Sequence, residues 1–182
     1  MEYKIPESWN DITISQFDDL SLMMEIEDPI QRDLQIKSVL LKRPINEIKV
    51  MKAFEMNEIE KKLKFILTKP TDHFDKIIEI DGVKYGFITD TSEMTYPEYI
   101  DGDVYSSDWD NSRCKLAAML WRRIIKEDEL GYEIEPYDPK NANRVADIFN
   151  HKMSYQNLFG AHLFFSHFVI ELLRISPQFL VR

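Results

Sequence analysis

The sequence contains little cysteine and little glycine, and each shortage excludes a class of function. Cys114 is the single cysteine, so the chain forms no internal disulfide and offers no C-x-x-C motif. Its five glycines are never adjacent, and none belongs to a glycine-rich loop of the kind that cradles phosphates. The N-terminal residues also lack the apolar stretch of a secretory signal. We therefore expect a soluble protein that works in a reducing compartment inside a cell.

Basic residues are in the minority. The chain has 23 Lys and Arg against 32 Asp and Glu, which gives a net charge of −9. An acidic protein gains nothing from the release of phosphate counterions, so we expect neither nucleic acid nor a membrane as a partner. Hydrophobic residues make up 44% of the sequence, as in folded proteins. With 182 residues, we expect a single domain over 1–182, or one with two lobes at 1–70 and 71–182.

The first 70 residues are predicted to be helical. A capping box of Thr13 and Gln16 precedes the first helix. The pair Asp28-Pro29 places proline at the first position of the second helix, which is a strong start signal. Apolar residues at three- and four-residue steps then indicate a third helix after a single helical turn. The three predicted helices, which would form an N-terminal bundle, span about 15–26, 29–43 and 53–68.

A β-hairpin is predicted in the middle of the chain. Asp81-Gly82 lies between two apolar runs, and a type I′ turn needs positive φ at both of its central residues, which Asp-Gly tolerates. This turn sets the register, because Ile80 then faces Val83. One face of the hairpin is apolar and the other carries an opposite-charge pair.

The second half of the chain is predicted to be mostly helical. A capping box of Thr95 and Glu98 begins a short helix, and the acidic residues that follow are expected to form a polar loop. The fold class that we expect is α+β and predominantly helical, with an N-terminal three-helix bundle, a central β-hairpin and C-terminal helices. The remaining elements are expected at about 96–102, 111–126, 139–150 and 155–175 for helices and at 132–134 for an edge strand beside the hairpin.

The last predicted helix is apolar around most of its circumference. Such a helix is buried on all sides, packed into a partner, or membrane-spanning. Polar and charged residues interrupt this run, which is too short to cross a membrane. A core helix and a helix with a partner-binding face stay open as alternatives. In the second case the expected partner-binding residues are Leu163, Phe164, Phe168, Val169 and Leu172.

Four aspartates raise the hypothesis of a cation site, because calcium binds carboxylates spaced along a loop. They are Asp101, Asp103, Asp108 and Asp110. The segment lacks the glycine and the closing glutamate of an EF-hand, so a solvated acidic loop is the expected reading. A metal-dependent enzyme that uses the Asp101–Asp110 loop is the remote alternative. The histidines are dispersed along the chain, and none is indicated as a base for Cys114. We therefore expect no enzyme, no catalytic residue, no metal site and no cofactor.

The order of these elements resembles that of small proteins from the tail-gene region of tailed bacteriophages. The opening motif W-x-D-x-T-x-x-Q-F stands at Trp9, Asp11, Thr13, Gln16 and Phe17. The segments IQRDLQIKSVLLKRPINEIKVM and EIEKKLKFILTKP continue the likeness. Further segments resemble phage proteins from Bacteroidetes hosts and extend the likeness over most of the chain; they are IIEIDGVKYGF, MTYPEYID, KLAAMLWRRI and YEIEPYD. The chain thus resembles phage tail assembly chaperones.

This resemblance implies a non-catalytic function. A tail assembly chaperone or adaptor would bind the helical tape-measure protein of the tail and shield its apolar stripes during virion morphogenesis. Its partners would be tail or other virion proteins, and a homo-oligomer stays open. Its location would be the cytoplasm of the bacterial host during phage assembly. The alternative is a structural or internal cargo protein that is retained in the virion, where the last helix would make a permanent contact.

Overall fold

The computed structural model describes residues 4–88, 90, 92 and 94–175, with side chains up to residue 166. The fold is α+β and predominantly helical, which confirms the predicted class. The chain divides into two compact units. The N-terminal unit comprises Met1–Pro70 and Ser154–Gln156, and the C-terminal unit comprises Thr71–Met153 and Asn157–Arg182.

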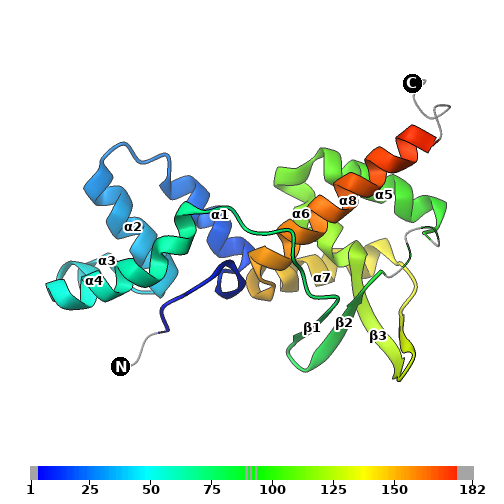
Figure 1. The fold of residues 1–182 in the computed structure, drawn as a ribbon, viewed down its shortest axis with the longest axis horizontal. Helices are drawn as coiled ribbons and strands as arrows, with labels where there is room; N and C mark the ends of the chain where they lie inside the picture. The colour runs from blue at the N-terminus through cyan, green and yellow to red at the C-terminus, as the bar shows by residue number, and fades with distance from the viewer. Residues whose placement is uncertain (1–3, 89, 91, 93, 176–182) are drawn as a thin grey trace. The chain divides into compact units, whose positions relative to one another are not determined.

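The helices of the N-terminal unit begin at the signals that the sequence carries. The hydroxyl of Thr13 accepts a hydrogen bond from the backbone N–H of Gln16 at 3.2 Å, and Asp28 accepts one from the backbone N–H of Ile30 at 2.9 Å. Both start signals are therefore confirmed. The elements are η1 (Trp9–Asp11), α1 (Ile14–Met23), α2 (Pro29–Leu41), α3 (Ile45–Lys49), α4 (Ala53–Lys62) and η2 (Leu63–Leu67) (Figure 1). The predicted helices correspond to α1, α2 and α4 with η2, and the predicted single turn is α3.

One aliphatic cluster forms the core of the N-terminal unit, and Trp9 packs at its edge. The indole ring of Trp9 meets the ring of Phe65 edge to face, with centroids 5.4 Å apart. Its Nε1 donates a hydrogen bond to the backbone oxygen of Thr68 at 3.0 Å, which joins the start of the unit to the end of η2. The buried members of the cluster are Ile12, Leu20, Ile36, Leu40, Leu41, Ile48, Ile59 and Leu63.

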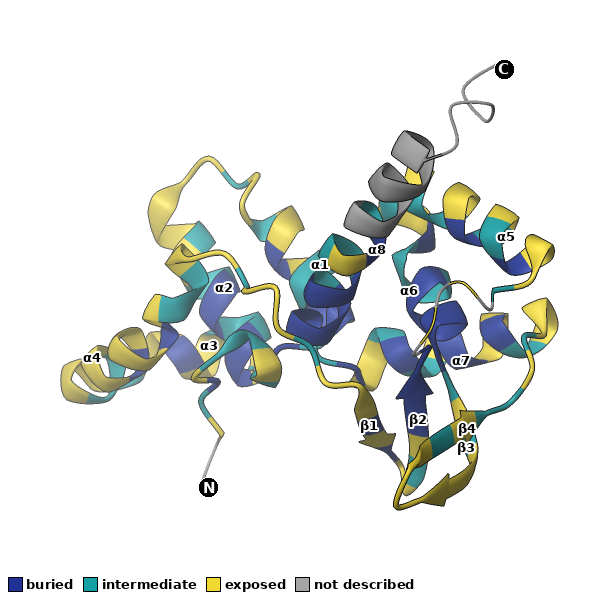
Figure 2. Cartoon of the chain, turned by 45° about the vertical axis from the view of Figure 1, so that its right-hand side comes forward, coloured by how far each residue is buried: buried dark blue, intermediate teal, exposed yellow. Residues whose placement is uncertain are grey.

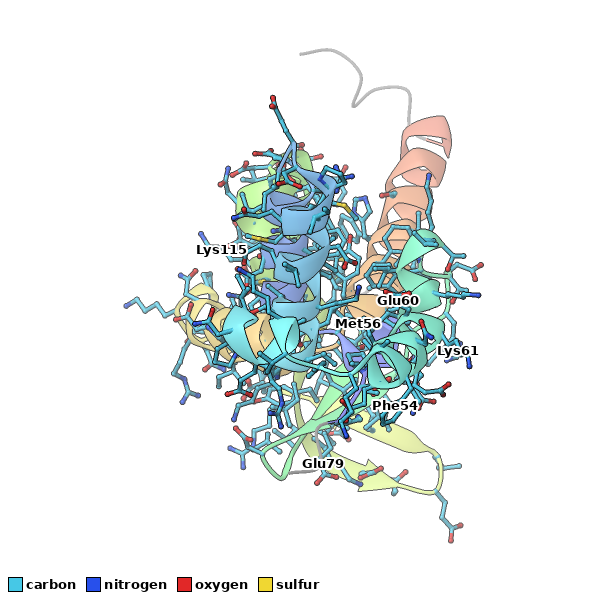
Figure 3. The ribbon with its side chains drawn as sticks, turned by 90° about the vertical axis from the view of Figure 1, so that its left-hand side faces the viewer. Phe54, Met56, Glu60, Lys61, Glu79 and Lys115 are labelled. Carbon is cyan, nitrogen blue, oxygen red and sulfur yellow. The ribbon has the colours of Figure 1, made fainter. Side chains whose placement is uncertain are left out.

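Helix α4 is amphipathic, and its side chains are visible in Figure 3. Met56 packs against the aliphatic core, whereas Phe54 is exposed. Glu60 lies 3.0 Å from the ammonium of Lys37, which is also 2.5 Å from a carboxylate oxygen of Asp33. Lys37 is buried, and a buried ammonium requires such partners because it has left water. This contact joins α4 to α2.

The C-terminal unit is built on a four-stranded antiparallel sheet in the order β1-β2-β3-β4. Ile80 pairs with Val83, as predicted. Asp81 and Gly82 both have positive φ, at 53° and 75°, which the type I′ turn requires. The strands are β1 (Ile77–Ile80), β2 (Val83–Phe87), β3 (Trp121–Asp128) and β4 (Gly131–Ile134).

Helices pack against one part of this sheet, where Tyr85 and Phe87 of β2 meet Phe149 of α7 and Phe164 of α8. The buried residues run along α6 and β2 in Figure 2. The five residues from Leu116 to Leu120 on α6 are all buried. The start of α7 at the predicted Asp138-Pro139 signal is confirmed, because the Asp138 carboxylate accepts a hydrogen bond from the backbone N–H of Lys140 at 3.0 Å. The helices are α5 (Tyr96–Ser107), α6 (Trp109–Leu120), α7 (Pro139–Lys152) and α8 (Tyr155–Ile175).

The predicted helix at 111–126 is wrong in its last third. Helix α6 ends at Leu120, and the chain enters β3 at Trp121. Trp121 pairs with Phe87 across the sheet, and their rings lie edge to face with centroids 4.7 Å apart. This pairing between distant residues overrides the local helical spacing. The edge strand expected beside the hairpin is β4, which pairs with β3 instead.

The acidic loop expected after residue 100 is also wrong. Helix α5 continues to Ser107, and α6 begins at Trp109, so only Asp108 separates the two helices. Asp108 has a backbone conformation outside the helical region and accepts a hydrogen bond from the side chain of Asn111 at 2.8 Å. Of the polar residues that suggested a loop, Asp103, Asp108 and Asp110 are exposed, whereas Asp101 is partly buried.

Gly160 lies in α8 directly against the backbone before β1, and this contact generates a first prediction. A Cβ added at Gly160 would lie 2.6 Å from the backbone oxygen of His73 and 2.9 Å from that of Asp72. Backbone atoms yield less readily than flexible side chains. We expect Gly160→Ala to lower the free energy of unfolding by about 1–3 kcal/mol in urea denaturation, in spite of the better helix propensity of alanine.

The matched control is Asn143→Ala at an exposed position of α7, which should change the unfolding free energy by less than about 0.5 kcal/mol. A Gly160→Ala protein as stable as the wild type would contradict the close approach of α8 to residues 72–73.

Candidate functional site

The predicted partner-binding residues of α8 fall partly inside the core. Phe164 is 40% exposed, but its ring also meets the rings of Phe74 and Phe87, with centroids 5.9 and 5.4 Å away. Leu163 is partly buried. The side chains of Phe168, Val169 and Leu172 lie outside the described residues. The part of α8 that is described therefore serves mainly as a core helix, with buried Leu158, Ala161 and Phe165.

Helix α5 differs from an ordinary amphipathic helix, because it buries a charged side chain and exposes apolar ones. Its inner face carries Glu98, whose carboxylate lies 2.8 Å from a guanidinium nitrogen of Arg122 on β3. The two side chains are only 5% and 11% exposed. The other oxygen of Glu98 accepts hydrogen bonds from the backbone N–H and the hydroxyl of Thr95, at 2.6 and 2.7 Å. The predicted capping box is therefore confirmed, and its glutamate is also half of a buried ion pair.

A second polar contact holds the same face of α5. The hydroxyl of Tyr137 donates a hydrogen bond to Asp101 at 2.6 Å. Burial and the neighbouring Asp101 raise the pKa of Tyr137, so this phenol stays protonated and donates. Gly102 is buried one turn after Glu98, where Phe165 of α8 and Met119 of α6 fill the space beside it. These contacts fix the rotation of α5 about its own axis.

The outer face of α5 is apolar. Tyr96, Ile100 and Val104 are 70%, 43% and 54% exposed. Four-residue steps place successive members of this set about 40° apart around the helix, so the three side chains form one row. The row lies opposite Glu98 and Gly102, which are about 200° further round. We call Tyr96, Ile100 and Val104 the α5 row. The α5 row was not predicted from the sequence, although the four-residue spacing of its apolar residues after the capping box indicates one face of a helix.

The chain around the α5 row is strongly acidic. Residues 85–112 include seven Asp and Glu and no Lys or Arg. Asp103 is exposed on the outer side of α5, and Asp108 and Asp110 are exposed beyond its C-terminal end. A helix C-terminus carries partial negative charge from its free carbonyl groups, which adds to the effect. The α5 row is therefore an apolar strip with the exposed carboxylate of Asp103 beside it.

The aspartates do not assemble a cation site within the part of the chain that the structure describes. No group of three or more His, Cys, Asp or Glu side chains among those residues is arranged to hold a metal ion. Asp101 accepts the hydroxyl of Tyr137, and Asp110 lies 3.5 Å from Arg113. The loop on which the metal hypothesis rested is replaced by α5 and α6.

A pocket with a volume of about 540 Å³ lies in the N-terminal unit. Its lining contains two ion pairs, because Lys4 lies 2.7 Å from Asp11 and Arg43 lies 2.6 Å from Glu47. The buried Gln16 donates from its side chain to the backbone oxygen of Val39 at 3.3 Å. This lining does not point to a particular ligand.

His162 on α8 carries a buried polar atom that lacks a hydrogen-bond partner among the described residues. This atom is Nδ1 of the ring, which lies on Trp109 with centroids 3.9 Å apart. Burial lowers the pKa of His162 below the ordinary 6.5, because the charged ring would lose its hydration. Burial therefore favours the neutral form of the His162 ring.

The buried ion pair predicts a non-additive response to mutation. Glu98→Gln leaves the guanidinium of Arg122 buried without its carboxylate, so we expect the free energy of unfolding to fall by roughly 3 kcal/mol. The double variant Glu98→Gln with Arg122→Met should lose clearly less than the sum of the two single variants. Urea denaturation of all three proteins measures this coupling. Glu133→Gln, which removes an exposed partner of Lys126, is the control and should resemble the wild type. Strictly additive losses would contradict a direct pair.

The environment of His162 predicts a pH dependence of stability. Because its pKa is lower in the folded than in the unfolded chain, the unfolded chain takes up the proton first as pH falls. The contribution of His162 to the free energy of unfolding is therefore fully present above about pH 6.5, and this contribution is lost as pH drops below that value. We expect His162→Phe to weaken this loss between about pH 8 and about pH 5, measured as the pH dependence of the thermal midpoint. The control is His151→Gln on the exposed side of α7, and an equal slope in all three proteins would contradict the prediction.

Comparison with protein-family profiles, with curated proteins and with solved structures found no match for this chain. Among the residues that the structure describes, no helix is both long enough and apolar enough to span a membrane.

Proposed function

We propose that this chain is a phage tail assembly chaperone or adaptor, which binds a helical tail protein of the tape-measure type during virion morphogenesis without catalysing a reaction. The observation that carries the proposal is the α5 row, whose apolar side chains face solvent while the inner face of the same helix is charged. The apolar side chains of the α5 row face solvent, so they do not contribute to the hydrophobic core. The row is suited to a partner.

Two further observations support a binding role that does not depend on a reaction centre. The buried contacts of Glu98 and Asp101 hold α5 in one orientation, so its row is presented without prior rearrangement. The net charge of −9 keeps a protein with exposed apolar side chains in solution while it is unbound. A chaperone that shields the apolar stripes of a long helical protein needs both properties.

The resemblance to tail assembly chaperones supplies the identity of the partner. It rests on the opening motif from Trp9 to Phe17 and on segments over most of the chain. The opening motif is structured as a capping box and the first turn of α1, where Phe17 stacks on Tyr155 with centroids 3.5 Å apart. The motif therefore has a folding role in the N-terminal unit, and the binding role falls to α5.

The test follows the protein through phage assembly. We expect the chain to be abundant in lysates taken before assembly is complete and absent from purified mature particles, measured by quantitative mass spectrometry. The full chain should also co-purify with the tape-measure protein from the early lysate. The major tail-tube protein, which should be enriched in the particles, serves as the internal control.

A fixed copy number in finished particles would overturn the chaperone proposal. It would instead identify the chain as a structural or internal cargo protein of the virion.

A further inference from the structure

We infer that the α5 row takes one kind of occupant, an amphipathic α-helix whose apolar stripe is flanked by Lys and Arg. This inference rests on the proposed function, because it names the chemistry of the partner at that site. Three features of α5 carry it: the spacing of the row, the charge beside the row, and the contacts that hold the helix in place.

The spacing of the row fits another helix. Tyr96, Ile100 and Val104 stand at four-residue steps, and such a ridge packs into the groove between the ridges of a second helix. The row is about 12 Å long at 1.5 Å per residue. A partner helix therefore needs two to three turns with apolar residues at three- and four-residue steps.

The charge beside the row selects the flanks of that helix. Asp103 is exposed next to Ile100 and Val104, and Asp108 and Asp110 are exposed past the end of α5. Asp110 lies 3.5 Å from Arg113, so the charge beside the row comes chiefly from Asp103. Carboxylates at the rim of an interface attract cationic side chains and repel anionic ones, and they act most at low salt. The complementary helix carries Lys or Arg beside its apolar stripe.

The same charge disfavours the other occupants. A second copy of this chain, placed row against row, would bring Asp103 and its acidic neighbours against their own copies, and like charges in contact are unfavourable. A nucleic acid or an anionic membrane would meet the same repulsion. Among the occupants that an apolar row can take, a basic helix satisfies both the apolar and the charged surroundings.

The row is held rigid from behind. Glu98 on the inner face pairs with Arg122 of β3, and Asp101 accepts the hydroxyl of Tyr137. A partner helix therefore meets a surface whose rotation is already fixed, and binding requires little ordering of α5 itself.

The experiment uses the full chain and synthetic peptides. The probe is a fluorescent amphipathic helix of about six turns with a leucine stripe and Lys flanks, and its matched control has the same stripe with Glu flanks. We expect the Lys peptide to bind at least about tenfold more tightly than the Glu peptide in fluorescence anisotropy at low salt. The difference should shrink as salt is added, because the flanking contacts are exposed.

Variants of the chain locate the site. Ile100→Ser with Val104→Ser should weaken binding of the Lys peptide by about tenfold or more, and Asp103→Lys should weaken it several-fold at low salt. The matched controls lie on the far turn of the β3–β4 hairpin, where Leu130→Ser removes an apolar side chain that is 99% exposed and Glu129→Lys reverses an exposed charge. Both controls should bind like the wild type. Circular dichroism checks that each variant is folded.

Several outcomes would overturn the inference. They are equal binding of the two peptides, no binding of the Lys peptide up to about 1 mM, and controls that are as damaging as the row variants. A homodimer that the row variants dissociate in gel filtration would assign the row to a second copy instead.

The failure of this inference and that of the proposed function are distinguishable. If the row variant still co-purifies with the tape-measure protein, the inference fails and the chaperone function stands. If the Lys peptide binds through the row but the tape-measure protein does not co-purify, the proposed function fails and the binding site stands.

Discussion

The buried ion pair between Glu98 and Arg122 is the contact on which the arrangement of the C-terminal unit depends. One oxygen of Glu98 satisfies the N-terminus of its own helix through Thr95, and the other meets Arg122 on the second residue of β3. Removing either partner would leave a buried charge without compensation, which is strongly unfavourable. The pair therefore fixes the start of α5 against the start of β3, and it does so in a single rotation of the helix.

That rotation explains the reversed polarity of α5. With Glu98 turned toward β3 and Gly102 packed against α6 and α8, residues on the opposite side of the helix must face solvent, and these include Ile100 and Val104. A helix docked by its apolar stripe would have the opposite orientation. Burial of a charged pair adds little stability over an apolar contact of similar size, but it selects one orientation. In this unit the selected orientation leaves the apolar row outside.

Signals within a few residues predicted where most elements begin, but they did not predict which elements contact one another. The capping residues and Asp81-Gly82 act within a few residues, so α1, α2, α7 and the hairpin were predictable from the sequence. Strand β3 was not, because Trp121 to Ile124 also fits a helical period and only its pairing with β2 decides the outcome. The α5 row escaped for a related reason. Its spacing was visible, but whether it faced inward depended on Arg122, which follows 22 residues after Ile100 in the chain.

The carboxylate beside the α5 row bears on what the exposed row can contact. An exposed apolar row is a hazard because copies of the same protein carry the same row and can associate through it. Asp103 lies beside the row, so association between copies would also bring like charges together, whereas a basic helix would meet opposite charges. Specificity is a difference between the affinities for two partners. The carboxylate of Asp103 would lower the affinity for a second copy and raise the affinity for a basic helix. On the proposed binding mode, the same charge would oppose association between copies and favour binding of a basic helix.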